Sequence, residues 1–180
     1  VHDEVMKIAI PMHKRIIHDT EGNISEQAYG NPGQAIYSVS RAELNALMME
    51  LAEKKGAKLE FNQFCTDVDF DAKSVTFENT ITKEINTINS DIIIGADGAL
   101  SEVRNKMIQK LEHDFKLIKI EHSYKELLIP AGVNRAHLID KNALHIWPRG
   151  EFMLIALANL DGSFTCTLFA PTVGKDSFEN

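Results

Sequence analysis

The sequence predicts an α/β protein of the mixed (α+β) type, in which a short α/β segment interrupts a β-rich chain. Three observations predict this fold class. Apolar and polar residues alternate toward both ends of the chain, which is the period of a half-buried strand. Between Ser40 and Gly56 the apolar period becomes that of a helix. At residues 91–98 an apolar run enters a glycine-rich turn, as buried parallel strands often do before a helix.

The composition excludes several classes of function. Of the 180 residues, 44% are apolar and 25% are charged, which is ordinary for a soluble globular domain. The net charge of −7 argues against nucleic-acid binding, because phosphates require a basic surface. Cys65 and Cys166 lack the spacing of a metal site, so we expect no metal, and free thiols in a reducing compartment. We expect the cytoplasm if the protein is bacterial, or a membrane-associated location if the parent protein carries a C-terminal anchor. The longest apolar run, FMLIALA, is too short to span a bilayer, so we expect no membrane contact from this segment.

The N-terminal residues predict strands. Residues 5–18 alternate with strand period, so the chain is expected to begin within a strand. Pro11 indicates an edge or a bend in this strand. A turn is expected at residues 19–24, followed by a short strand at residues 34–40.

A helix is expected to follow at once. Ser40 and Glu43 have the spacing of a capping box, in which the serine hydroxyl accepts a hydrogen bond from the N3 amide. Gly56 provides the C-terminal stop. The apolar residues at helical spacing between them are Leu44, Leu47, Met48 and Leu51.

The remaining elements are read from the same periods. The middle of the chain predicts a strand, a β meander with two turns, a strand that is apolar on both faces, and a helix. These are expected at residues 58–62, 64–90 (turns at 71–74 and 79–84), 91–96 and about 101–111. Four more strands are expected at residues 123–129, 143–148, 151–158 and 163–169, with a hairpin turn at residues 159–162. The β-rich segments at the two ends would join one sheet if the middle is an inserted excursion.

The turn after the apolar run has the chemistry of a ligand site. A strand that ends in Asp97 and Gly98 before a helix places backbone amides and the positive end of a helix dipole at the edge of a sheet. Ligands of α/β sheets bind at this edge. An Asp there can accept hydrogen bonds from a sugar diol. From the local residues alone, a serine-capped helix after a tight turn stays open as the alternative.

Residues 91–104 resemble the DG motif of the flavin-dependent aromatic hydroxylases, the para-hydroxybenzoate hydroxylase family. In that family a strand, an Asp-Gly pair, a Ser and an Arg recur in this order. Arg41 matches the Arg that opens a helix before the meander. The run from Leu144 to Phe169 resembles one member of the family closely, and the resemblance covers nearly the whole chain. It implies part of an FAD-binding α/β domain at residues 39–112, with a mixed β-sheet substrate domain of the para-hydroxybenzoate hydroxylase type at residues 1–38 and 113–180.

The resemblance also implies an activity. Members of the family are monooxygenases that hold FAD, use NADPH as co-substrate and transfer oxygen from O2 to the aromatic ring of a small-molecule substrate. Because the electron-rich ring is itself the nucleophile, no catalytic side chain is implied. The protein has to position the ring and exclude water.

Particular residues match positions that bind the substrate in the family. Arg15 and Tyr29 match a pair that holds the substrate carboxylate, a role suited to a guanidinium fork and a phenol. The alternatives are a solvated strand residue and a loop anchor. Four more residues match the lining of the ring pocket, with plain sheet core as the alternative: Leu144, Ile155, Leu157 and Phe169. His145 and Trp147 belong to the same run, and for His145 a buried core histidine is the expectation.

Other residues match positions that bind the cofactor. Arg41 matches the Arg that lies along the flavin, and Asp97 matches the acid near the FAD ribose, with Gly98 allowing close approach. Cys65 falls where the family places a backbone contact to the adenine. Arg104 is expected to hold the turn from the helix.

The family's GxGxxG motif is absent from these residues, so the chain is expected to be an internal fragment that alone neither retains FAD nor hydroxylates a substrate. Three alternatives remain open. The parent could be another hydroxylase of the family that acts on a phenol, or a non-catalytic binding module that kept the scaffold. It could also be a Rossmann-like NAD protein, although the missing GxGxxG and the meander before residue 91 argue against that.

Overall fold

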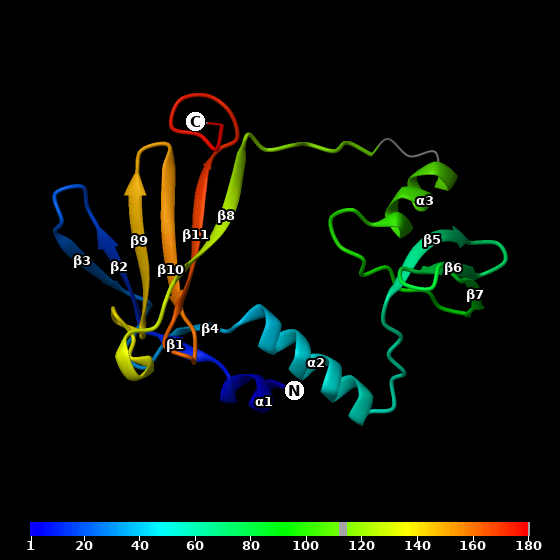
Figure 1. Ribbon diagram of the computed structural model, residues 1–180, viewed down its shortest axis with the longest axis horizontal. Helices are drawn as coiled ribbons and strands as arrows, with labels where there is room; N and C mark the ends of the chain where they lie inside the picture. Colours follow the sequence, from blue (N-terminus) through cyan, green and yellow to red (C-terminus); the bar gives the residue numbers. More distant parts are fainter. Residues whose placement is uncertain (112–114, 180) are drawn as a thin grey trace. The chain divides into compact units, whose positions relative to one another are not determined.

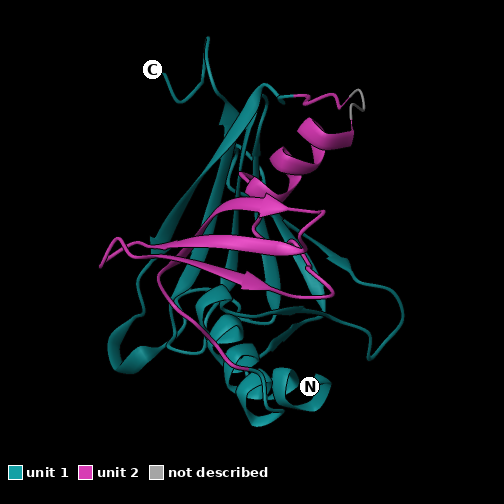
Figure 2. Ribbon diagram, turned by 90° about the vertical axis from the view of Figure 1, so that its right-hand side faces the viewer, with its two compact units in different colours: residues 1–57, 119–180 teal, residues 58–118 magenta. Residues whose placement is uncertain are grey.

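The residues described in this computed structural model are 1–111 and 115–179, and the chain divides into two units (Figure 2). Unit 1 comprises residues 1–57 and 119–180, and unit 2 comprises residues 58–118. The segments that flank unit 2 in the sequence therefore belong to one unit.

A six-stranded mixed sheet forms the centre of unit 1. Its strands are β2 (Lys14–His18), β3 (Ile24–Ala28), β8 (His122–Ile129), β9 (Ala143–Arg149), β10 (Phe152–Ala158) and β11 (Phe164–Pro171). Their order is β3-β2-β9-β10-β11-β8, and every neighbouring pair is antiparallel except β2 and β9, which are parallel (Figure 1). The expectation that the two ends of the chain join one sheet is confirmed.

Smaller elements complete unit 1. Strands β1 (Ile10–Met12) and β4 (Ile36–Ser38) form a two-stranded antiparallel sheet. Helix α2 (Arg41–Lys54) confirms the predicted capping, since the Ser40 hydroxyl accepts a hydrogen bond from the Glu43 amide at 3.4 Å. Gly56 follows the helix with φ +91°, a conformation that favours glycine. The remaining elements are α1 (His2–Lys7) and a short 3-10 turn, η1 (Val133–Arg135).

The prediction that the chain begins within a strand is wrong. Residues His2–Lys7 form a helical turn and a half, and the strand period holds only from Ile10 onward. Asp3 and Glu4 lie in the first turn, where the helix dipole favours negative charge, and Lys7 forms an ion pair with Glu4 at 2.7 Å. These local charges favour a helix, and no described strand pairs with this segment.

Unit 2 contains the predicted meander. Strands β5 (Gln63–Asp69), β6 (Ser74–Asn79) and β7 (Ile85–Asn89) form an antiparallel sheet in the order β5-β6-β7. Helix α3 (Glu102–Leu111) packs against β5, and Lys106 forms an ion pair with Asp67 of that strand at 2.8 Å. The meander and the helix are confirmed.

Two predicted strands are absent from unit 2. Residues 58–62 and 91–96 have no strand structure, because no described strand lies beside them to complete a hydrogen-bond ladder. Ile92 and Ile94 are 77% and 83% exposed. Their apolar side chains predicted a buried strand, but no element of the described chain packs over them to bury them.

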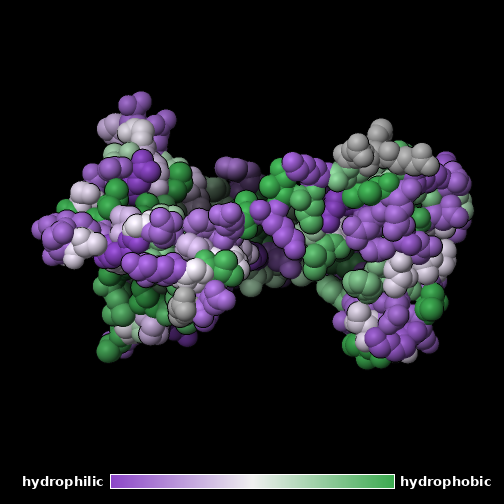
Figure 3. All heavy atoms as spheres, turned by 90° about the horizontal axis from the view of Figure 1, so that it is seen from above, coloured by the Kyte–Doolittle hydropathy of each residue, from purple (hydrophilic) through white to green (hydrophobic). Residues whose placement is uncertain are grey.

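The core of unit 1 lies on one face of the six-stranded sheet. The buried residues there are Ala156 and Ala158 of β10, Phe164 and Cys166 of β11, and Ile10 of β1. Burying one side chain as large as Phe164 stabilises a fold by about 1.5–3 kcal/mol. Hydrophobic residues nevertheless reach the surface of both units (Figure 3). Among the described residues, no helix combines the length and the apolar character needed to span a membrane.

Candidate functional site

The residues predicted to contact the substrate lie on the sheet face opposite this core. In the parallel ladder of β2 and β9, Arg15 pairs with Leu144. Ile155 of β10 pairs with Ile146, which lies two residues beyond Leu144 on β9. Because paired residues point to the same side and side chains alternate along a strand, Arg15, Leu144 and Ile155 share one face.

The same face continues onto β11. Leu157 lies two residues beyond Ile155, and Phe169 pairs with Met153, two residues before Ile155. Leu144, Ile155, Leu157 and Phe169 are each half-buried, whereas the core residues between them on the other face are fully buried. These four side chains are thus placed on a partly open apolar surface rather than in the centre of the core.

Arg15 and Tyr29 lie together at one side of this face. The Arg15 guanidinium carbon lies 5.8 Å from the centre of the Tyr29 ring, within the range of a cation–π contact. The Tyr29 amide donates a hydrogen bond to the carbonyl oxygen of His13 at 2.9 Å, which extends the β2–β3 pairing to Tyr29. Arg15 is exposed and forms no ion pair with the described part of the chain. A carboxylate could therefore approach its guanidinium.

A groove of about 960 Å³ lies between this sheet face and the N-terminal half of α2. Its lining joins Leu157, a predicted substrate contact, to Arg41, a predicted cofactor contact. A second cavity of about 490 Å³ is lined by Tyr29 and shares Tyr37 with the groove. Within unit 1, therefore, Tyr29 of the candidate carboxylate pair and Arg41, the candidate flavin arginine, border adjoining hollows.

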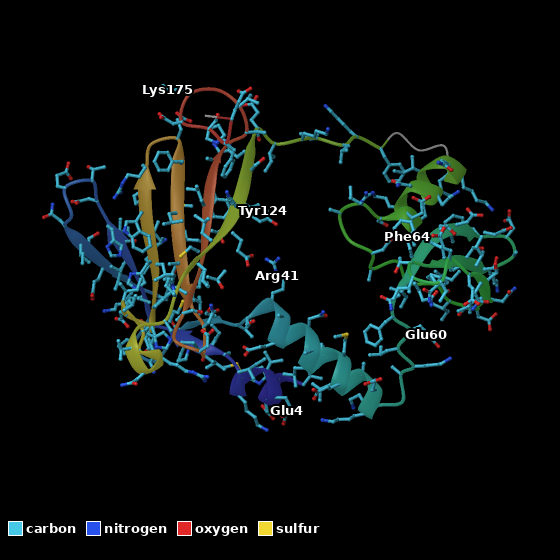
Figure 4. All side chains as sticks on the ribbon, in the orientation of Figure 1. Glu4, Arg41, Glu60, Phe64, Tyr124 and Lys175 are labelled. Atoms are coloured by element: carbon cyan, nitrogen blue, oxygen red, sulfur yellow. The ribbon has the colours of Figure 1, made fainter. Side chains whose placement is uncertain are left out.

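Arg41 is positioned by the cap of its helix. The Ser38 hydroxyl donates a hydrogen bond to the carbonyl oxygen of Ala158 at 3.1 Å, which ties β4 to the end of β10 immediately before Ser40 caps α2. Figure 4 shows the Arg41 side chain projecting from the first turn of α2, on the same side of the sheet as Tyr124 of β8. A cation here is unfavourable for the helix dipole, so an anionic ligand would relieve the repulsion.

Asp97, in unit 2, caps helix α3. Its carboxylate accepts hydrogen bonds from the Ser101 hydroxyl at 2.6 Å and from the amides of Glu102 and Val103 at 2.8 and 3.2 Å. The Ser101 hydroxyl bond is the main cause that lowers the pKa of Asp97 below its ordinary value, and the backbone amides lower it further. The capped-helix alternative from the sequence is therefore realised, and it leaves the carboxylate ionised at neutral pH. As predicted, Arg104 holds the turn: its guanidinium donates to the carbonyl oxygen of Ala99 at 2.6 Å.

The local geometry still fits a ribose contact. A carboxylate can accept about four hydrogen bonds, and Asp97 receives three from its own chain. Its side chain is exposed, so the remaining acceptor position faces solvent. Gly98 has φ +79°, and a Cβ built on it would meet no atom within 4 Å, so the backbone is open to close approach. The ribose role of Asp97 stays a prediction that this geometry permits.

Cys65 lies at an irregularity of β5. The ladder with β6 shifts register between Cys65 and Asp67, which is where a β-bulge leaves backbone groups unpaired. Burial, reinforced by the nearby carboxylates of Asp97 and Glu102, raises the pKa of the Cys65 thiol. The thiol is thus uncharged at neutral pH, in keeping with a contact made by the backbone rather than by the sulfur.

The sequence interpretation missed polar residues that line the groove. Thr165 and Thr167 of β11 and Glu126 of β8 border it, on the face that carries Leu157. The two-residue period of a strand predicts the position of the threonines, because Thr165 and Thr167 lie four and two residues before Phe169 and so share its face of β11. Glu126 could not have been placed, since it reaches this face only through the pairing of β8 with β11.

Comparison with known families places the chain in a family. A family model described as an FAD binding domain matches residues 3–139, which is more than half of the chain. The chain therefore belongs to the FAD-binding domain family.

Two curated relatives of the chain share one name, kynurenine 3-monooxygenase. The chain is 46% identical over 180 residues to the kynurenine 3-monooxygenase of Flavobacterium johnsoniae, matching all of this chain and 40% of that protein. It is 45% identical over 180 residues to the kynurenine 3-monooxygenase of Dictyostelium discoideum, matching 99% of this chain and 38% of that protein. These relatives confirm the resemblance seen in the sequence, and the chain spans about two fifths of their length.

Solved structures confirm the fold at low sequence identity. Klebsiella pneumoniae HpxO complexed with FAD and uric acid is 17% identical, with a TM-score of 0.67, over 94% of this chain and 42% of that one. A flavoprotein/dehydrogenase from Cytophaga hutchinsonii is 14% identical, also with a TM-score of 0.67, over 90% of this chain and 40% of that one. The mixed sheet with its inserted α/β segment is thus the para-hydroxybenzoate hydroxylase type of architecture.

Proposed function

We propose that this chain supplies the substrate-binding sheet and part of the flavin-binding domain of a kynurenine 3-monooxygenase. The whole enzyme would hydroxylate L-kynurenine to 3-hydroxykynurenine with FAD, NADPH and O2, a step of tryptophan catabolism. The observation that carries the proposal is the Arg15–Tyr29 pair beside the apolar face formed by Leu144, Ile155, Leu157 and Phe169. The names of the relatives support the choice of substrate.

Kynurenine combines a charged amino-acid end with an aromatic ring, and the two parts of the site suit these two ends. The Arg15 guanidinium would bind the carboxylate, with the Tyr29 hydroxyl as a second donor. A hydrogen bond to a charged group contributes about 1.5–3 kcal/mol. The half-buried side chains of the sheet face would pack on the ring and exclude water from it.

Four residues would hold FAD, which supplies the oxygen-activating chemistry when bound. Arg41 would lie along the flavin, and Asp97 would accept a hydrogen bond from the ribose. Gly98 would allow the nucleotide to approach the backbone, and the backbone of Cys65 would contact the adenine. The exposed carboxylate of Asp97 and the open space at Gly98 support these assignments.

A chimera tests the proposed function. In it, this chain replaces the matching segment of the Flavobacterium johnsoniae enzyme, because we expect the 180-residue chain alone to lose FAD on dialysis. We expect the FAD-loaded chimera to hydroxylate L-kynurenine. Arg15→Ala should raise KM for kynurenine by about tenfold or more, as the loss of one charged hydrogen bond implies. It should also raise the NADPH consumed per product formed.

Lys125→Ala is the matched control, since Lys125 is an exposed cation of β8 outside the site. The control should leave both quantities unchanged. An FAD-loaded chimera that ignores kynurenine but oxidises NADPH in response to a simple phenol would show that the substrate assignment is wrong. A chimera that folds yet binds no FAD would favour a non-catalytic binding module.

A further inference from the structure

Three side chains of β9 have no part in the proposed chemistry. His145, Trp147 and Arg149 alternate along the strand, so they share the face opposite Leu144 and Ile146. All three contact the end of β2. With His18 they form a group that we name the β2 clamp, consisting of His18, His145, Trp147 and Arg149.

The imidazoles of the β2 clamp form a directed chain of hydrogen bonds. His145 Nε2 lies 2.8 Å from the carbonyl oxygen of Asp140, and because a carbonyl only accepts, this nitrogen carries the hydrogen. In the neutral form of His145, Nδ1 is then the acceptor for His18 Nε2–H at 2.9 Å. The His18 ring also stacks on Trp147, with ring centres 4.3 Å apart and planes 10° from parallel. His145 is 2% exposed, so this series of hydrogen bonds passes through a buried side chain.

Arg149 fastens the backbone where β2 ends. Its guanidinium donates to the carbonyl oxygen of His18 at 2.9 Å and to that of Asp19 at 3.0 Å. The Asp19 carboxylate in turn accepts hydrogen bonds from the amides of Glu21 and Asn23 at 3.0 and 2.7 Å, which closes the turn into β3. Arg149 therefore holds both the last residue of β2 and the turn that follows it.

This hairpin carries the candidate carboxylate pair. Arg15 lies on β2, and Tyr29 follows directly after β3. β3 is an edge strand whose five residues are all exposed, so apolar packing does little to fix it. The position of β3 depends on the ladder with β2, on the Lys14–Glu26 ion pair at 2.7 Å, and on the contacts that hold the turn between β2 and β3.

We propose that the β2 clamp is a positioning unit for the Arg15–Tyr29 pair, and this inference rests on the proposed function. The clamp touches neither side chain of the pair. It sets the twist and end point of the hairpin from which both project, so that guanidinium and phenol converge on one carboxylate. Positioning errors of about 1 Å at a binding group can cost up to ~100-fold in rate.

The test compares two substrates in the FAD-loaded chimera: L-kynurenine and kynuramine, its decarboxylated analogue. Arg149→Gln shortens the side chain, keeps an amide donor and removes the guanidinium fork that spans two carbonyls. We expect it to raise KM for L-kynurenine by about 5- to 10-fold, the scale of one well-made hydrogen bond. KM for kynuramine should stay unchanged, because that substrate has no carboxylate. Lys125→Gln, the same change of charge at an exposed site, should alter neither.

A second comparison separates positioning from general damage to the fold. Once Arg15→Ala is present, adding Arg149→Gln should raise KM for kynurenine no further, because the pair it would position is gone. If Arg149→Gln fails to load FAD, Trp147→Phe and Arg149→Lys replace it. Each keeps one of the clamp's contacts and should give a smaller increase for kynurenine alone.

Equal KM increases for the two substrates, or additive effects with Arg15→Ala, would show that the clamp only stabilises the sheet. Unchanged KM in every clamp variant would also overturn the inference. A wild-type chimera that loads FAD but does not hydroxylate kynurenine would instead count against the proposed function, so the two failures are distinguishable.

Discussion

Asp97 shows how one carboxylate can be committed to its own chain and still be available to a ligand. Three donors of α3 and its cap hold it, yet the side chain stays exposed next to a glycine with open space around it. A structural role and a binding role are therefore compatible here, and a pair of variants can separate them.

Ser101→Ala and Asp97→Ala should have different effects on flavin retention. The Ser101 hydroxyl accepts a hydrogen bond from the Arg104 amide at 3.0 Å, so its loss should cost about 1 kcal/mol of unfolding free energy, as loss of a helix cap usually does. If Asp97 also binds the ribose, only Asp97→Ala should lose FAD from the chimera. The measurements are urea unfolding and bound flavin absorbance after dialysis. Equal retention in both variants would leave Asp97 with its capping role alone.

His18 should make the stability of unit 1 depend on pH. Burial, then the neighbouring His145 and the Arg149 cation, lower the pKa of His18 below its ordinary value of 6.5. The unfolded chain therefore binds a proton more readily than the folded chain. Stability should be complete above about pH 6.5 and should fall as pH drops from there toward the lowered folded pKa.

The check is urea unfolding of the chain at several pH values between about 5 and 8, with Trp147 fluorescence as the probe of the transition. His18→Gln can still donate a hydrogen bond to His145 but does not titrate in this range, so its stability should change less with pH. His2→Gln makes the same substitution at an exposed histidine and serves as the control. A His18→Gln slope equal to that of the wild type would contradict the assignment.

At the scale of elements, the hairpin between β10 and β11 illustrates a turn that the sequence specifies completely. Gly162 has φ +93° and donates its amide hydrogen bond to the carbonyl oxygen of Asn159 at 3.2 Å. The Asp161 carboxylate accepts from the amide of Ser163 at 2.9 Å. A Cβ on Gly162 would lie 2.1 Å from the carbonyl oxygen of Arg135.

Gly162→Ala should therefore destabilise unit 1 more than Gly150→Ala does. Gly150 also has positive φ, +65°, but a Cβ there would meet nothing within 4 Å. Its substitution should cost about 1–2 kcal/mol, the strain of a left-handed alanine. Gly162→Ala adds a clash with backbone that cannot rotate away. Equal midpoints of urea unfolding for the two variants would show that the Arg135 segment moves freely.

Elements defined by local residues were predictable from the sequence, and elements defined by distant partners were not. Ser40 caps α2 through an amide three residues away, and residues 159–162 close their own turn. Residues 91–96 instead require neighbouring strands, which the described chain does not place beside them. Likewise, alternation placed Ile155 and Leu157 on one face, but only the β8–β11 register brings Glu126 to the same groove.

For the whole molecule, the decisive feature is the unequal core of its two units. Among the described residues, the buried hydrophobic side chains of unit 2 are Val68 and Val75 alone. Those of unit 1 include Met12, Phe164 and Cys166 with several alanines and isoleucines. A unit of residues 58–118 is small enough that so thin a core leaves it marginal. Other large apolar side chains of unit 2 are exposed and do not contribute to its core, namely Ile81, Ile85, Ile92, Ile94 and Leu100.

The two units should therefore unfold in separate transitions, unit 2 at the lower urea concentration. Trp147, the sole tryptophan, lies on β9 and reports on unit 1. Amide hydrogen exchange of residues 63–89 reports on unit 2, and we expect it to lose protection while Trp147 fluorescence is still native.

Val75→Ala tests the assignment, since removing one of two core side chains should cost unit 2 about 2 kcal/mol and leave the Trp147 midpoint in place. Ala156 on β10 provides the reciprocal change: Ala156→Gly should move the Trp147 midpoint and spare unit 2. A single transition, shared by both probes and shifted by either substitution, would mean that the chain folds as one cooperative body. The thin core of unit 2 would then be stabilised from outside that unit.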